Sequence, residues 1–266
     1  MMPRNLVLVR HGLSEANVAV KASKRGDDTL RKKLFCEKHD SLMRLMPKGV
    51  EQAEKAGEWL RDEFPNGFSR HYSSEYIRAM ETSAHLGLPG AVWYTDRNLG
   101  ERSYGIHNLH SLEEIREEYK NWMYYQKLEP IYWNPIGGET LTSLCIRLRI
   151  IIDTLHRECS TDDVIIVCHG EVMWGFRIIL ERMTQERFKI LDASTDPKDR
   201  MNNGQVIQYS RINPSTNEET PYYNWMRSVC PNNMKLSRNV WEPVVRPRFT
   251  NEELLERVNL ISRIIQ

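Results

Sequence analysis

The chain has 266 residues, 40% of them hydrophobic and 27% charged, which is enough to bury a sizeable core in one large domain or a domain with an appendage. A net charge of +1 provides no global field to hold nucleic acid or a membrane, so we expect neither as a partner. Five cysteines without paired spacing are typical of a reducing compartment. The first apolar run is too short for a signal peptide, and no run approaches a membrane span, so we expect a cytoplasmic protein.

Strand-like and helix-like segments alternate along the chain, a pattern that predicts an α/β three-layer sandwich. Its central sheet is expected to be mostly parallel, with helices on both faces. Strands are expected near residues 5–9, 69–73, 91–94, 163–168 and 205–210. Helices are expected at residues 48–63, 75–86, 111–124, 140–158 and 171–183.

The first expected strand ends at Arg10, His11 and Gly12. Open α/β sheets bind ligands at the carboxyl ends of their strands. Arginine supplies planar donors for phosphoryl oxygens, histidine can be a nucleophile near neutral pH, and glycine lets the backbone approach an anion. The sequence therefore predicts a phosphate site at this strand end.

The segments that follow contain further parts of such a site. Residues 18–47 form a basic connection, which is either a solvated face or a cover for the pocket. Residues 72–82 then pass from strand into helix, with Ser73 or Ser74 as the expected N-cap and Arg78 about one turn in. A turn-prone loop at residues 99–105 contains Glu101, and residues 163–170 repeat the first design, with His169 and Gly170 after an apolar strand.

Four segments, taken in chain order, resemble the histidine phosphatase superfamily in its phosphoglycerate mutase-like branch. They are the first strand end with Arg10 to Gly12, residues 72–82, residues 99–105 and residues 163–170. The resemblance covers roughly residues 5–210. It implies that His11 is transiently phosphorylated, and that Arg10, Arg78 and His169 bind the phosphoryl group. In the mutase branch the proton donor lies in a Leu-x-Glu-Arg-x-Tyr-Gly loop, which matches residues 99–105 and assigns the acid role to Glu101.

Several weaker matches complete the expected site. Ser14 and Asn17 match a Ser-x-x-Asn pattern after the first motif, and Asn17 is counted with Gly170 among the substrate-binding residues. Arg102 either contacts the substrate, supports the residues that do, or lies on the surface. Glu139, at the start of the helix expected at 140–158, is the alternative acid.

The expected activity is hydrolysis of phosphomonoesters through a phosphohistidine on His11, with no metal and no other cofactor. The substrate is expected to be a phosphorylated small molecule or a phosphoprotein. One alternative is a phosphoglycerate mutase-type phosphotransferase, although residues 106–110 lack the continuation associated with cofactor-dependent mutases. The other is a non-catalytic phospho-ligand-binding module, which a missing core residue would indicate, and none is missing. The six remaining histidines lack metal-ligand spacing and are interpreted as structural or solvated.

The catalytic domain is expected to span residues 1–210, and residues 211–266 form a C-terminal extension. Thr250 and Glu253 form a capping box that predicts a final helix. A broad apolar side follows it, made of Leu254, Leu255, Val258, Ile261 and Ile265. We expect the extension either to pack on its own domain or to contact a second subunit, which leaves a homo-oligomer open.

Overall fold

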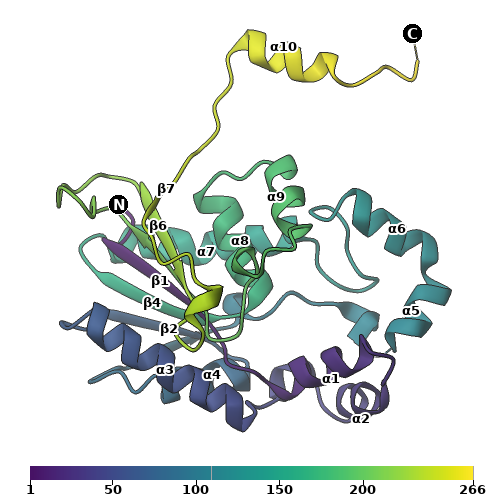
Figure 1. The fold of residues 1–266 in the computed structure, drawn as a ribbon, viewed down its shortest axis with the longest axis horizontal. Coiled ribbons are helices and arrows are strands. Elements are labelled where there is room, and N and C mark those ends of the chain that lie inside the picture. Colours follow the sequence, from purple (N-terminus) through teal and green to yellow (C-terminus); the bar gives the residue numbers. More distant parts are fainter. Residues whose placement is uncertain (109, 266) are drawn as a thin grey trace.

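Within residues 1–108 and 110–265, which the computed structural model describes, the chain folds around a seven-stranded sheet of order β3-β2-β4-β1-β5-β6-β7 (Figure 1). The strands are β1 Asn5–Arg10, β2 Arg70–Ser74, β3 Trp93–Asp96, β4 Asp163–Cys168, β5 Val206–Ser210, β6 Trp225–Val229 and β7 Glu242–Pro243. The strands from β3 to β1 are parallel, whereas β5, β6 and β7 add antiparallel pairs. The expected parallel centre is confirmed.

Helices cover both faces of this sheet. They are α1 Glu15–Ser23, α2 Thr29–Glu37, α3 Pro47–Glu63, α4 Ile77–His85, α5 Leu112–Glu118, α6 Lys120–Leu128, α7 Leu141–Glu158, α8 Gly170–Leu180, α9 Gln185–Asp192 and α10 Asn251–Asn259. Short 3-10 helices are η1 Asp40–Leu42, η2 Arg97–Leu99, η3 Gly105–Asn108, η4 Pro197–Asp199 and η5 Met234–Leu236.

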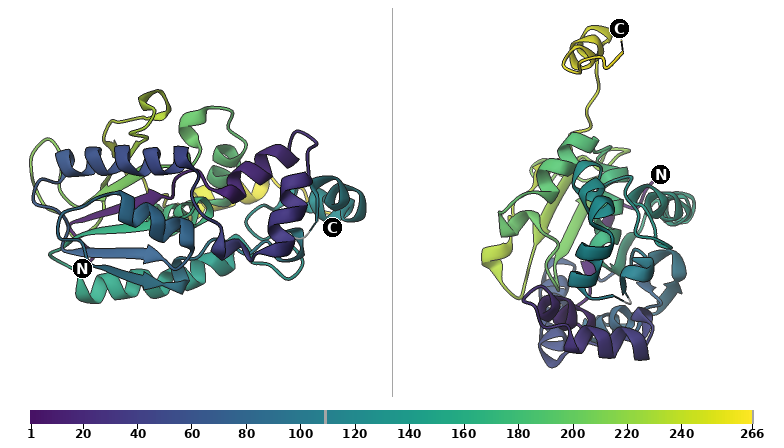
Figure 2. Two further views of the ribbon diagram at one scale, coloured as in Figure 1. Left: turned by 90° about the horizontal axis from the view of Figure 1, so that it is seen from below. Right: turned by 90° about the vertical axis from the view of Figure 1, so that its right-hand side faces the viewer.

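The layers follow from the alternation of side chains along β1 and β4. One set of buried residues packs against α7 and α8: Leu6, Leu8, Val164 and Ile166. The other set packs against α3 and α4: Val7, Val9, Ile165 and Val167. Figure 2 shows the sheet between these two helix layers, so the three-layer prediction is confirmed.

Two local predictions are corrected by the structure. Ser73 and Ser74 do not cap α4, whose N-cap is Tyr76. Ser74 is still within the strand, and its hydroxyl oxygen accepts the N–H of Tyr76 and contacts His169 instead. The helix expected at 111–124 is two helices, because the backbone departs from helical geometry at Tyr119.

The basic connection at residues 18–47 is mostly helical. Ser14 and Asn17 form a capping box that starts α1 directly after the first motif, and α2 packs beside it. Five residues from this region line the cavity described below: Val20, Lys21, Lys24, Phe35 and Asp40. The segment therefore forms one wall of the pocket.

The C-terminal extension divides into two parts. β6 and β7 continue the sheet, and Arg227 lies between the rings of Trp59 and Trp241, at 5.0 and 4.8 Å from their centroids. The boundary expected at residue 210 therefore falls inside the sheet. α10 is different, because all its residues are exposed and Figure 1 shows it standing away from the sheet. Its Thr250–Glu253 capping box is present as predicted.

Candidate active site

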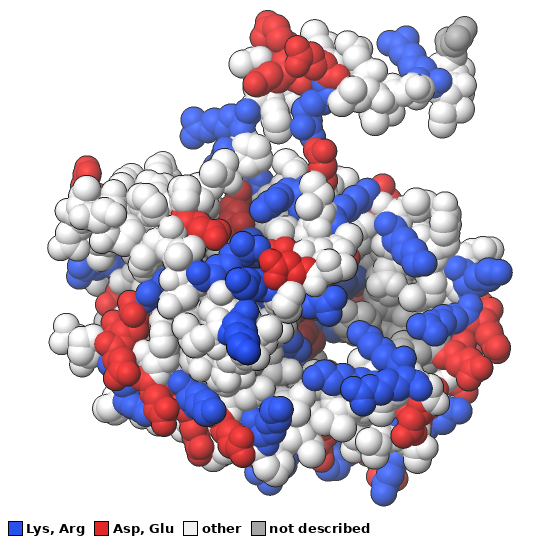
Figure 3. All heavy atoms as spheres, in the orientation of Figure 1, with Lys and Arg blue, Asp and Glu red and all other residues white. Residues whose placement is uncertain are grey.

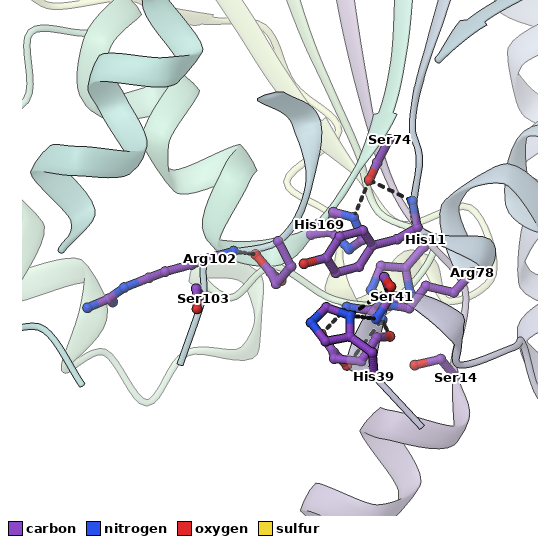
Figure 4. A network of polar contacts seen from close by, with 12 residues as sticks. His11, Ser14, His39, Ser41, Ser74, Arg78, Arg102, Ser103 and His169 are labelled. Atoms are coloured by element: carbon purple, nitrogen blue, oxygen red, sulfur yellow. Dashed lines mark hydrogen bonds and ion pairs between the residues drawn. The ribbon is translucent and has the colours of Figure 1, made fainter. Parts of the chain in front are cut away.

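The two histidine motifs lie side by side because β1 and β4 are adjacent and parallel. Arg10 is paired in register with Cys168, so His11 and His169 follow at the same edge of the sheet. The backbone N–H of His11 donates to the carbonyl of Cys168 at 3.0 Å. The imidazole rings are 5.1 Å apart between centroids and inclined by 62° (Figure 4).

His11 is held as a neutral imidazole with one nitrogen facing the site. It is 1% exposed, and its Nδ1 lies 2.7 Å from the carbonyl oxygen of Gly12, which can only accept a hydrogen bond. The proton is therefore on Nδ1, and Nε2 accepts from Nε of Arg78 at 3.3 Å. Burial, followed by the charges of Arg78 and Arg10, holds the pKa of His11 well below its ordinary value. The arrangement presents an unprotonated Nε2.

His169 is completely buried and has one nitrogen without a partner. Its Nε2 lies 2.8 Å from the hydroxyl of Ser74 (Figure 4). Among the described residues, its Nδ1 has no hydrogen-bond partner. Burial, with the charges of Arg78 and His11, lowers the pKa of His169 well below its usual range. Nδ1 therefore has an unused hydrogen-bonding position, although His169 is not among the residues that line the two cavities described below.

The guanidinium of Arg10 is fixed at the end of β1. Its Nη1 donates to the carbonyl of Met201, while its buried Nε has no partner within the described part of the chain. Gly170 lies against this guanidinium, since a Cβ built on it would be in ordinary contact with Nε of Arg10 at 3.4 Å. Burial lowers the pKa of Arg10 below its ordinary value, although Glu101 opposes the effect. An unpaired buried N–H of this kind is suited to an anion.

Arg78 is 3% exposed and is held by a residue that sequence reasoning missed. Its Nη1 and Nη2 donate to the two carboxylate oxygens of Asp40 at 3.2 and 3.0 Å, and Nη1 also donates to the backbone carbonyl of Asp40 at 2.6 Å. This forked contact turns Nε toward His11. Asp40 lies in η1, and nothing in the sequence between α2 and α3 indicated the pairing.

Glu101 lies between the two arginines and a second carboxylate. One of its oxygens accepts the backbone N–H of Arg102 at 3.0 Å. Burial, together with repulsion from Glu171, raises the pKa of Glu101 to about 7, although the Arg102 N–H, Arg78 and Arg10 oppose the rise. A carboxyl group with this pKa exists in both protonation states near neutral pH.

Two neighbouring residues are placed differently from expectation. Arg102, expected as a substrate ligand, is 5% exposed and points away from His11 (Figure 4). Its Nε and Nη2 donate to the carbonyls of Glu139 and Trp133, both at 2.8 Å, so it holds the loop together. Glu139, the alternative acid, has both oxygens on Arg147, at 2.8 and 3.0 Å. Although burial opposes it, hydrogen bonds from Arg147 and from the N–H of Ser103 lower the pKa of Glu139, so this carboxylate stays charged.

Asn17 reaches the site through a second residue that sequence reasoning missed. Its side-chain oxygen accepts from Nδ2 of Asn203 at 2.9 Å. The same Nδ2 also donates to the carbonyls of His11 at 3.1 Å and Gly12 at 3.3 Å. Asn203 precedes Gly204 in the turn before β5, and that Asn-Gly pair was the available signal.

These groups surround a cavity of about 350 Å³. It is lined by His11, Arg10, Arg78, Asn17 and Glu101, together with residues of α1, α2 and the loop before β5. A second cavity of about 400 Å³ adjoins it and shares Arg10 and Glu101 with it, and adds Gly170. In Figure 3, Lys and Arg side chains gather around a hollow on this face of the molecule. Neither cavity is lined by Arg102 or Glu139.

The six remaining histidines are all described by the structure, and none of them lines either cavity. Among residues 1–108 and 110–265, no three His, Cys, Asp or Glu side chains are grouped so that they could hold a metal ion. His71 and His107 are buried, while His156 is exposed on α7. None of the helices that the structure describes is both long and apolar enough to cross a bilayer.

The chain is similar in sequence to known proteins. A family model described as the histidine phosphatase superfamily (branch 1) matches residues 6–196. The 2,3-bisphosphoglycerate-dependent phosphoglycerate mutase of Methylorubrum populi is 29% identical over 200 residues, which cover 73% of this chain and 87% of the relative.

Two solved structures show the same fold. A mycobacterial glucosyl-3-phosphoglycerate phosphatase complexed with VO3 aligns with a TM-score of 0.60 at 23% identity, over 78% of this chain and 92% of that one. The α-ribazole phosphatase from Shigella flexneri aligns with a TM-score of 0.60 at 19% identity, over 82% and 96% of the two chains. At these identities the likeness concerns the fold alone.

Proposed function

Because the chain belongs to the histidine phosphatase superfamily, we propose that it hydrolyses phosphomonoesters through a phosphohistidine on His11. The observation that carries the proposal is the convergence of His11, Arg10, Arg78 and Glu101 on one cavity. A neutral imidazole, two guanidinium groups and a carboxyl with a pKa of about 7 are the parts that such a reaction needs.

In the first step, Nε2 of His11 attacks phosphorus and the bond to the leaving oxygen breaks. Arg10 and Arg78 neutralise charge on the non-bridging oxygens and neutral His169 donates its Nδ1–H to one of them, so the transfer does not depend on a metal. Protonated Glu101 gives its proton to the leaving oxygen, and an alcohol departs.

In the second step, water attacks the phosphohistidine and the bond between phosphorus and Nε2 breaks. Glu101, now a carboxylate, takes a proton from that water, which restores the acid and releases inorganic phosphate. Water reaches this cavity because part of its wall, at Lys21, Lys24 and Arg200, is exposed to solvent. This access favours hydrolysis over transfer to a second alcohol.

The proposal is tested by trapping the intermediate. His11→Asn should abolish both phosphate release and acid-labile phosphate incorporation, because no other nucleophile lies at the end of β1. The matched control is His156→Asn, on the exposed side of α7, which should keep both. Turnover should also persist in excess chelator. Phosphate release by His11→Asn, or activity lost in chelator and restored by Mg²⁺, contradicts this mechanism.

The second candidate is a phosphoglycerate mutase-type phosphotransferase, which the name of the Methylorubrum populi relative favours. A mutase must keep its phosphohistidine from water until a second hydroxyl takes the phosphoryl group. Supplying 3-phosphoglycerate with a trace of 2,3-bisphosphoglycerate separates the two activities. We expect free phosphate to appear faster than 2-phosphoglycerate, and the reverse order would establish the transferase.

A further inference from the structure

Three cations on the wall of the cavity take no part in the mechanism above. The side chains of Lys21, Lys24 and Arg200 line the cavity and are exposed to solvent. The ion pairs among the described residues include none of the three. Each therefore has its charge available to a ligand.

Two of these cations belong to one helical row, with Lys21 on α1 and Lys24 at its C-cap, where the backbone is still helical. Asn17, Lys21 and Lys24 are spaced at i, i+4 and i+7, which places them in a row along a helix, and all three line the cavity. Asn17 marks the inner end of the row, because Asn203 joins it to the backbone of His11. With a rise of about 1.5 Å per residue, Lys21 and Lys24 lie roughly 6 and 10 Å farther along the helix axis.

Arg200 lines the cavity from a different segment, the loop that precedes β5. It directly precedes Met201, whose carbonyl holds the guanidinium of Arg10 at the phosphoryl site. Arg200 also lines the adjoining cavity, as does Lys24, so the two cations border the same passage. The loop before β5 therefore places the charge of Arg200 near the phosphoryl site, although Arg200 has no role in the phosphoryl transfer itself.

The charges of the cavity are unbalanced in its outer part. Its lining holds five cations, which are Arg10, Lys21, Lys24, Arg78 and Arg200, and only two carboxylates, Asp40 and Glu101. Asp40 is paired with Arg78, and Glu101 is half-protonated at neutral pH. A neutral leaving group would gain nothing from the outer cations, whereas an anionic one would be attracted to them.

We propose that Lys21, Lys24 and Arg200 form a second anion subsite. The substrate it fits is a small phosphomonoester whose other end carries a phosphate or carboxylate. A cavity of about 350 Å³ suits a small molecule rather than a protein surface. This inference rests on the proposed phosphatase function for the identity of the first anion.

The test compares two probes that differ only in the second anion, 1,6-hexanediol bisphosphate and hexyl phosphate. For the natural chain, the KM for the bisphosphate should be about tenfold lower, and this advantage should shrink at high salt. In the triple variant Lys21→Gln, Lys24→Gln and Arg200→Gln the advantage should disappear. The matched control is Lys33→Gln on the exposed side of α2, away from the cavity, which should keep it.

Binding without turnover separates the two proposals. The non-hydrolysable 1,6-hexanebisphosphonate and hexylphosphonate are compared by calorimetry, and p-nitrophenyl phosphate reports phosphatase activity by itself. Absent p-nitrophenyl phosphate turnover with a retained preference for the bisphosphonate refutes the hydrolase and keeps the subsite. Equal affinities for the two phosphonates, or a preference that survives in the triple variant, overturns the subsite.

Discussion

Replacing Glu101 with glutamine should separate substrates by their leaving groups. The amide can still accept the N–H of Arg102 but has no proton to give to the departing oxygen. With a pKa of 4.5 only about 0.3% of this carboxyl would be protonated at pH 7, whereas a pKa of about 7 leaves about half of it protonated. The protein environment thus raises the protonated fraction of Glu101 at pH 7 by roughly 150-fold, which lies within the range of rate gains from general acid catalysis.

The assay is rapid-quench measurement of phosphoenzyme formation, because this step alone uses Glu101 as an acid. For an alkyl phosphate such as hexyl phosphate, Glu101→Gln should slow the step by about 100-fold or more. For p-nitrophenyl phosphate, whose leaving group needs little protonation, the loss should stay below about tenfold. Arg78→Ala should slow both, since every phosphoryl transition state needs its charge.

The pH dependence provides an independent check with a definite sign. Glu101 acts in its protonated form, so phosphoenzyme formation from hexyl phosphate should fall as pH rises through about 7. Glu101→Gln should lose this fall. Equal losses on the two substrates would refute the acid role, and a leaving-group-dependent loss in Glu139→Gln would transfer it to that residue.

Three further predictions concern the stability of the fold around the site. Gly12→Ala should lower the free energy of unfolding, measured in urea, by about 3 kcal/mol, because the added Cβ would lie 2.1 Å from the carbonyl oxygen of Gly49. Gly170→Ala should cost less than about 1 kcal/mol, because the nearest atom to its added Cβ is 3.4 Å away. Arg147→Met should cost about 2 kcal/mol by the same measurement, since it leaves the Glu139 carboxylate half-buried and unpaired, and an equal loss in the exposed Arg149→Met would contradict this reason. The folded state raises the pKa of Glu101, so the contribution of this group to the free energy of unfolding is complete below pH 4.5 and is lost as pH rises through about 7. Glu101→Gln should therefore gain about 1–3 kcal/mol of stability relative to the natural chain between pH 5 and pH 8. A difference that does not change with pH would argue against the raised pKa.

The sequence alone was sufficient for the features that depend on local pattern. Apolar runs that end in histidine predicted β1 and β4 and placed His11 and His169 at the same edge of a parallel sheet. That the two strands are neighbours was decided by the fold. The layers followed from the alternation of strands and helices. Even the capping box of α10 was visible, since the two residues that form it, Thr250 and Glu253, lie three apart.

Tertiary structure alone decided which partner each polar side chain takes. Asp40 holds Arg78, Arg147 holds Glu139, and Arg102 donates to the backbone of Trp133 and Glu139. Such contacts join segments that are far apart along the chain, and their geometry depends on how the loops pack. The same packing buries Glu101 beside Glu171 and turns the lysines of α1 toward the cavity. Burial and pairing, which set pKa values and available charge, are properties of the folded neighbourhood and leave no local pattern in the sequence.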